Sequence, residues 1–238
     1  MEKAHIGHHI SQQFNVELED IRNRVLAMGG LVEQQLADAL IALTEGNSEI
    51  AEKVVTTDLQ VNAMEVAIDE ECSRVLARRQ PAASDLRLIV AVIKTITDLE
   101  RIGDQAERVA RMSLRLAESG ADYRQYSSIR LLGERARQQL HDTLDAFARM
   151  DTEAAVRVAR ADIETDRDYN ALMRQLITFM MEDPRTISSS LEVLFIAKAI
   201  ERIGDHARNI CEYLIYLVKG KDVRHVSLEQ MEAVSRNP

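Results

Sequence analysis

One pentapeptide, Glu-Arg-Ile-Gly-Asp, occurs twice in the chain, at residues 100–104 and again at 201–205. Within a helix, its glutamate and aspartate are four residues apart and therefore share one face. The two carboxylate pairs are Glu100 with Asp104, and Glu201 with Asp205. A glycine inside a helix is less favourable than alanine by about 1 kcal/mol. Its presence in both copies indicates that another group approaches the backbone closely there.

A second polar pair precedes each pentapeptide. Asp58 and Asn62 are four residues apart, and so are Asp162 and Asp166. Each of these pairs and the pentapeptide that follows it are equidistant from a proline turn, at Pro81 in the first half and at 183–184 in the second. Helices joined by a short turn run antiparallel, so equidistant positions lie at one level. The sequence therefore predicts two clusters of oxygen ligands: Asp58, Asn62, Glu100 and Asp104, then Asp162, Asp166, Glu201 and Asp205.

Carboxylates crowded at one level repel one another unless a cation lies between them. Oxygen-rich, sulfur-free ligand sets suit Mg²⁺, Mn²⁺, Fe or Zn²⁺. We therefore predict that both clusters bind metal ions. The simpler alternative is a solvated acidic face, in which Arg101 and Arg202 neutralise neighbouring carboxylates.

A metal-dependent enzyme is the alternative function. Di-iron helical bundles combine glutamates with a Glu-x-x-His step, which the helical part of this sequence lacks. Of its two helical histidines, His141 and His206, the second is five residues from Glu201 and is expected to be exposed. We find no glycine-rich phosphate loop, Ser-His-Asp set or nucleophilic cysteine. We therefore predict no catalytic activity.

Long helices must position these clusters. Apolar residues recur at three- and four-residue steps, and no segment alternates as a strand does. This pattern predicts an all-α fold with two tandem, internally duplicated three-helix bundles. The predicted helices cover about 16–46, 48–79, 84–120, 123–149, 152–182 and 189–220, the last capped by Ser189 and Glu192. The predicted parts are a flexible N-terminal tail at 1–15, a first bundle at 16–120, a second bundle at 121–222 and a loosely packed C-terminal tail at 223–238.

Composition limits the partners. The net charge of −9 disfavours nucleic acid. The longest uninterrupted apolar run, Leu88–Ile93, is far too short to cross a membrane, so we predict no transmembrane segment. The two cysteines, Cys72 and Cys211, are expected to be buried hydrophobic residues. Nothing calls for an oxidising compartment, and we expect a cytoplasmic protein.

Several further stretches, together with the repeated pentapeptide, resemble the PhoU family of bacterial phosphate-signalling accessory proteins. The resemblance covers nearly the whole chain. The stretches are MGGLVEQQL (28–36), RQPAASDLRLIVAVIKT (79–95), LDAFARMD (144–151) and MMEDPRTI (180–187).

The resemblance implies two similar three-helix bundles, frequent homodimers and metal ions bound by a repeated Glu/Asp-x-x-x-Asp motif. It also implies a regulator without catalytic activity that represses the phosphate-starvation response when phosphate is plentiful. Such a regulator links the cytoplasmic subunits of the high-affinity phosphate ABC transporter to a sensor histidine kinase, and it restrains phosphate uptake. Asn62 departs from the motif, so the first cluster is expected to bind metal more weakly or with fewer ligands.

Overall fold

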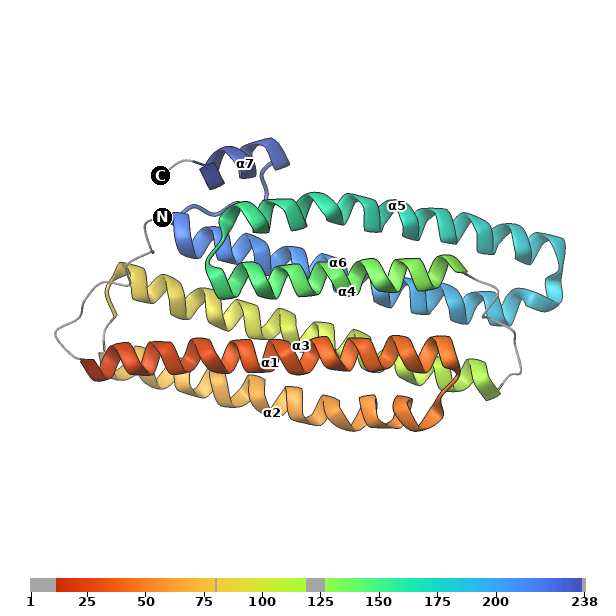
Figure 1. Ribbon diagram of the computed structural model, residues 1–238, viewed down its shortest axis with the longest axis horizontal. Coiled ribbons are helices and arrows are strands. Elements are labelled where there is room, and N and C mark those ends of the chain that lie inside the picture. Colours follow the sequence, from red (N-terminus) through yellow and green to blue (C-terminus); the bar gives the residue numbers. More distant parts are fainter. Residues whose placement is uncertain (1–11, 80, 119–126, 237–238) are drawn as a thin grey trace.

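The computed structural model describes residues 12–79, 81–118 and 127–236, which form helices and no strands (Figure 1). This confirms the all-α prediction. Of the predicted flexible N-terminal tail, residues 1–11 lie outside the described part, and a helix has already begun at Gln12. The helices are α1 (Gln12–Glu45), α2 (Ser48–Arg79), α3 (Ala83–Glu118), α4 (Ser127–Arg149), α5 (Thr152–Glu182), α6 (Ile187–Lys219) and α7 (Leu228–Arg236).

The helix ends follow from local chemistry. Gly46 and Gly220 take left-handed backbone angles, with φ of 69° and 67°, and so end α1 and α6 as helix-terminating glycines commonly do. The predicted start of α6 at Ser189 is wrong. Pro184 opens a 3-10 turn, Pro184–Thr186, that runs directly into α6 at Ile187. Ser189 therefore lies inside the helix, where its hydroxyl donates to the carbonyl of Thr186.

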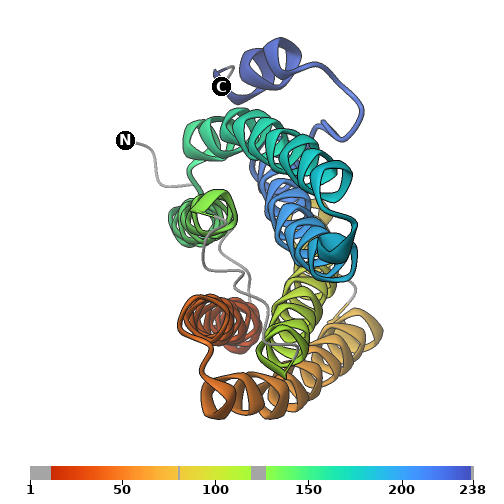
Figure 2. The ribbon, with the colours of Figure 1, turned by 90° about the vertical axis from the view of Figure 1, so that its right-hand side faces the viewer.

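Two three-helix bundles, α1–α3 and α4–α6, pack side by side (Figure 2). Their central contact is between α3 and α6, which run antiparallel, and α1 also contacts α4. Buried apolar side chains from both bundles form one continuous core. The α2–α3 turn and the α5–α6 turn consequently lie at opposite ends of the molecule (Figure 1).

Helix α1 is the one described helix with the length and hydropathy of a candidate membrane span, between Phe14 and Glu45. More than half of its most apolar stretch, 56%, is buried inside the protein. The predicted stripe on this helix, which includes Ile21, Val25 and Met28, lies in the core. Packing within the bundles therefore accounts for the hydropathy of α1.

The prediction of a loosely packed C-terminal tail is wrong for the described residues. Helix α7 packs against α5, with Met231 fully buried. Arg160 of α5 donates to Glu232 at 2.8 Å. A helix of nine residues is marginal in isolation. Tertiary contacts with α5, which a search for a long apolar stripe does not detect, stabilise it.

Candidate metal centres

The first cluster is built around Asp58, a buried residue of α2. Gln35 of α1 donates its side-chain amide to one carboxylate oxygen of Asp58 at 3.1 Å, and Asn62 donates to the other at 3.2 Å. Gly103 of α3 lies against the same group. A Cβ atom at Gly103 would lie 3.0 Å from Gln35 Oε1 and 3.4 Å from Asp58 Oδ1. The glycine thus makes room for the polar side chains, as its position in the repeat predicts.

Glu100 and Asp104 of α3 complete this cluster. Burial, followed by the charges of Asp104, Glu65 and Asp58, raises the pKa of Glu100 to about 6. Burial and the charge of Asp58 also raise the pKa of Asp104. The structure therefore brings the four predicted residues together from α2 and α3, and it shows the mutual repulsion that their spacing predicts.

Two oxygen atoms of the first cluster lack hydrogen-bond donors. Gln35 Oε1 and Asn62 Oδ1 are both buried without a partner. A buried polar oxygen without a partner is unfavourable by about 1–3 kcal/mol. Two such oxygens beside three carboxylates form a donor set that fits a hard cation.

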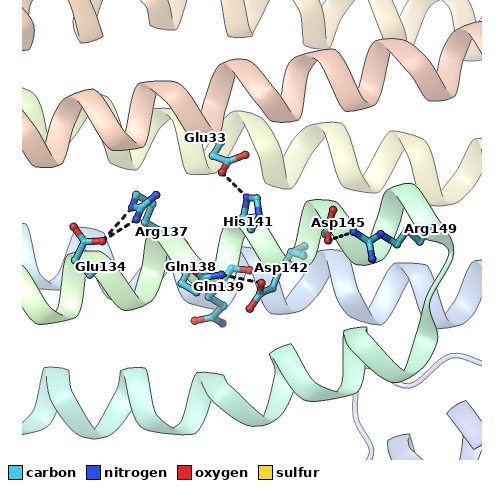
Figure 3. A network of polar contacts seen from close by, with 10 residues as sticks. Glu33, Glu134, Arg137, Gln138, Gln139, His141, Asp142, Asp145 and Arg149 are labelled. Carbon is cyan, nitrogen blue, oxygen red and sulfur yellow. Dashed lines mark hydrogen bonds and ion pairs between the residues drawn. The ribbon is translucent and has the colours of Figure 1, made fainter.

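The second cluster repeats this architecture around Asp162 of α5. Gln139 of α4 donates to Asp162 at 3.0 Å and to the carbonyl of Gly204 at 3.1 Å. Its own side-chain oxygen accepts a hydrogen bond from Thr165 at 3.1 Å. Figure 3 shows Gln139 on the side of α4 opposite His141, whose pair with Glu33 joins α4 to α1.

Three carboxylates converge in the second cluster. Asp166, Glu201 and Asp205 each offer an oxygen within 4.8 Å of the others. Burial, then the charges of Glu201 and Asp162, raises the pKa of Asp205 to about 6. The pKa of Asp166 is raised by burial and by the same two neighbours. All four residues predicted for this half therefore lie together.

Two cations border the second cluster. Lys198 Nζ lies 2.6 Å from each carboxylate oxygen of Glu201. Arg208 lies 3.5 Å from Asp162. Sequence reasoning did not assign Lys198, although its position three residues before Glu201 was a usable signal.

The two glutamines were also missed. Gln35 lies in the stripe of apolar residues at three- and four-residue steps on the first helix, and it was given no role from the sequence. A polar residue in such a stripe is itself a signal, because a buried amide needs partners. Gln139 is its counterpart in the second bundle.

His206 is not exposed, contrary to the sequence prediction. It is buried between the bundles, with Nδ1 2.7 Å from Asp98 of α3. The prediction failed because α6 has two buried faces, one toward α4 and α5 and one toward α3. His206 therefore lies in the interior, although it is on a different side of α6 from the carboxylates.

The described residues of the two clusters offer carboxylate and amide oxygens, and no activated nucleophile is evident among the described residues. Burial raises the pKa of both Cys72 and Cys211 to about 12, so neither forms a thiolate readily at neutral pH. Beside α4, a groove of about 470 Å³ lies between Arg135, Asp142 and Arg157. Its described arginines already have acidic partners, such as Asp168 for Arg135. The carboxylate clusters are therefore the stronger candidate sites.

Comparison with known proteins identifies the same two units. The PhoU domain model matches residues 25–113 and 129–214. A phosphate-specific transport system accessory protein PhoU homolog of Pseudomonas putida is 54% identical over 97% of this chain and 90% of its own. The crystal structure of PhoU from Pseudomonas aeruginosa has a TM-score of 0.85 at 53% identity, covering 88% of this chain and 100% of that one. The phosphate transport system regulatory protein PhoU from Streptococcus pneumoniae has a TM-score of 0.82 at 33% identity, covering 89% of this chain and 99% of that one.

Proposed function

Because this chain belongs to the PhoU family, we propose that it is a cytoplasmic regulatory adaptor of a phosphate-specific transport system. In this role it contacts the cytoplasmic subunits of the phosphate ABC transporter and a sensor histidine kinase. It represses the phosphate-starvation response when phosphate is plentiful and restrains phosphate uptake. The names of its relatives, an accessory protein and a regulatory protein of phosphate transport, support this proposal.

The observation that carries the adaptor role is an exposed apolar surface at the α5–α6 turn, which we call the turn patch. Its members lie at four-residue steps on each helix, so that those of one helix share one face of that helix. They are Ile177 and Met181 on α5, and Ile187, Leu191 and Phe195 on α6. Exposed apolar side chains that gather near one turn mark a candidate protein interaction site.

Placing charges in the turn patch tests the adaptor role. We expect Met181→Asp with Phe195→Asp to reduce capture of the transporter ATPase subunit or of the kinase cytoplasmic domain at least about tenfold. Met181 is 79% exposed and Phe195 47%, so thermal unfolding of the variant is measured beside capture to establish that the fold is intact. Leu59→Asp is the matched control, because Leu59 is 70% exposed on α2, away from this turn.

The same double variant should leave a phosphate-replete cell with constitutive expression of starvation genes, as deletion of the gene should. If capture of both partners and repression persist in the double variant, the turn patch does not carry the adaptor role. If repression also persists after deletion of the gene, the regulatory function itself is wrong.

We also propose that both carboxylate clusters hold divalent cations. The fit rests on the unpartnered oxygens of Gln35 and Asn62 and on the space that Gly103 and Gly204 leave beside Asp58 and Asp162. A bound Mg²⁺, Mn²⁺, Fe or Zn²⁺ would supply positive charge between the helices. The oxygen-only donor set favours the harder ions of this group.

Metal content tests this part of the proposal. We expect Glu100→Ala and Glu201→Ala each to lower the metal bound per chain by about half, because each removes one ligand from one of two sites. Elemental analysis of protein dialysed to equilibrium against enough Mn²⁺ to fill both sites, with the free Mn²⁺ of the dialysate subtracted, gives the measurement. Glu134→Ala is the control, because Glu134 is an exposed carboxylate paired with Arg137 outside both clusters (Figure 3). Unchanged metal content in both cluster variants would remove the ligand assignment.

A further inference from the structure

The two clusters present equivalent ligands in different electrostatic surroundings. An offset of 104 positions pairs Gln35 with Gln139, Asp58 with Asp162 and Asn62 with Asp166, and an offset of 101 positions pairs Glu100 with Glu201 and Asp104 with Asp205. The residue three positions before the glutamate is Thr97 in the first cluster and Lys198 in the second. The residue three positions after the second carboxylate is Glu107 in the first and Arg208 in the second.

Lys198 already occupies the place of a cation. Its ammonium lies 2.6 Å from both oxygens of Glu201, so both are engaged in charge-assisted contacts. The ring of Tyr169, whose centroid lies 5.3 Å from Nζ, holds the ammonium from the other side. The Lys198 side chain is about half exposed, at 47%, so it can swing into solvent when it leaves Glu201.

The first cluster has no such group at the equivalent position. Thr97 is uncharged, and its hydroxyl donates to the carbonyl of Ile93 at 3.0 Å. Glu65 lies close enough to Glu100 to raise the pKa of that residue, so the surroundings add negative charge. The nearby cation Arg111 is engaged with Glu107 at 2.5 Å.

The glutamines of the two clusters show the same contrast. Gln35 Oε1 and Asn62 Oδ1 have no donor, whereas Gln139 Oε1 accepts from Thr165. The first cluster thus keeps two unpartnered acceptors and has no lysine at the place that Lys198 takes in the second. In the second cluster, Glu201 and Gln139 are already satisfied by other residues of the chain.

We propose that Lys198 competes with metal for Glu201, so that the first cluster is the tight site and the second binds metal only after the ammonium is displaced. This inference rests on the proposed metal function. It reverses the expectation that Asn62 makes the first cluster the weaker one. The second cluster would then fill only at a higher concentration of free metal than the first, because binding there must also separate Lys198 from Glu201.

Titration of the EDTA-treated, full-length protein with Mn²⁺ at pH 7.5, followed by calorimetry, tests the inference. The parent protein should show a tight and a weak class of site, and Glu100→Ala should abolish the tight class. Lys198→Met should strengthen the weak class about tenfold or more, because a positive charge next to the ion is lost. Lys198→Arg keeps the charge and should stay close to the parent. Thr97→Lys, the matched swap, should weaken the tight class by a similar factor.

The outcomes separate the two proposals. Suppose that Mn²⁺ binds, but that Lys198→Met leaves the affinity of the weak site unchanged and Thr97→Lys leaves that of the tight site unchanged. The competition is then wrong, and metal binding stands. If Lys198→Met strengthens the class that Glu100→Ala abolishes, the assignment of the two sites is overturned. Absence of Mn²⁺ binding in the parent and in every variant would overturn both the metal proposal and the competition.

Discussion

The metal-free protein is expected to lose stability as the pH rises from 5 to 8, by on the order of 2–4 kcal/mol in the free energy of unfolding. The groups responsible are carboxyls whose pKa is raised mainly by burial: Glu100 and Asp205 to about 6 and Glu212 to about 7. At pH 5 these groups hold a proton in the folded state but are largely ionised when the chain unfolds. Raising the pH removes the folded-state protons, so folding loses this contribution. The magnitude is discounted because Glu100 and Asp205 are partly exposed to solvent.

Carboxyls whose pKa is lowered in the folded state affect stability in a different pH range. Arg224 holds the pKa of Asp222 at about 2, so that group affects stability only below about pH 4. Asp222 therefore does not contribute to the loss between pH 5 and 8. Mn²⁺ or Mg²⁺ should restore stability at pH 8 and have little effect at pH 5, where protons compete for the same oxygens.

Urea denaturation in EDTA at several pH values measures this effect. The variant Glu100→Gln/Asp205→Asn, which lacks two of the titrating groups, should show a flatter profile. It should also gain less from metal at pH 8. A parent protein that is as stable at pH 8 as at pH 5 in EDTA would contradict the expected repulsion within the clusters.

Removing the carboxylate of Asp98 is expected to destabilise the protein by about 3 kcal/mol. Asp98 is buried on α3 and receives contacts from α6: His206 Nδ1 at 2.7 Å and Asn209 Nδ2 at 3.3 Å. Tyr213 forms a further hydrogen bond with it. Asp98→Ala would leave these polar groups without their acceptor at the contact between the two bundles. Removing one partner of a buried polar network is more harmful than removing a surface pair.

Asp145→Ala provides the comparison. Asp145 pairs with Arg149 at 2.7 Å on the exposed side of α4, and its loss should change stability by less than about 0.5 kcal/mol. Thermal and urea unfolding of both variants give the measurement. The double variant Asp98→Ala/His206→Ala should be less destabilised than the sum of the single variants, since the two residues share one contact. A loss below about 1 kcal/mol for Asp98→Ala would show that the network does not hold the bundles together.

The helical fold was predictable because its signals are local and repeated. Apolar steps define one buried face per helix, and glycine or proline lies at several ends, as at Gly46 and Gly220. The α3–α6 contact was not predictable in this way. A helix covered on two sides has buried polar residues outside its main stripe, which is why His206 was misplaced. Helix α7 was missed because its stability comes from α5.

The candidate ligands were predictable for a geometric reason. Positions equidistant from a tight turn meet across an antiparallel hairpin, so Asp166 could be placed beside Glu201, and Asp162 beside Asp205, from numbering alone. This rule does not reach the first helix of each bundle, α1 or α4, and Gln35 and Gln139 were therefore not assigned. The role of Lys198 depends on a side-chain conformation, which spacing suggests but does not specify.

The antiparallel contact of α3 with α6 has one more consequence. Two separate copies of a single bundle, related by a two-fold axis through that contact, would carry identical residues at both clusters. One polypeptide that contains both bundles is free of this symmetry requirement. A substitution can then alter one centre and leave its twin unchanged, as the difference between Thr97 and Lys198 illustrates. Internal duplication thus allows one molecule to carry two clusters that differ in their affinity for the same ligand.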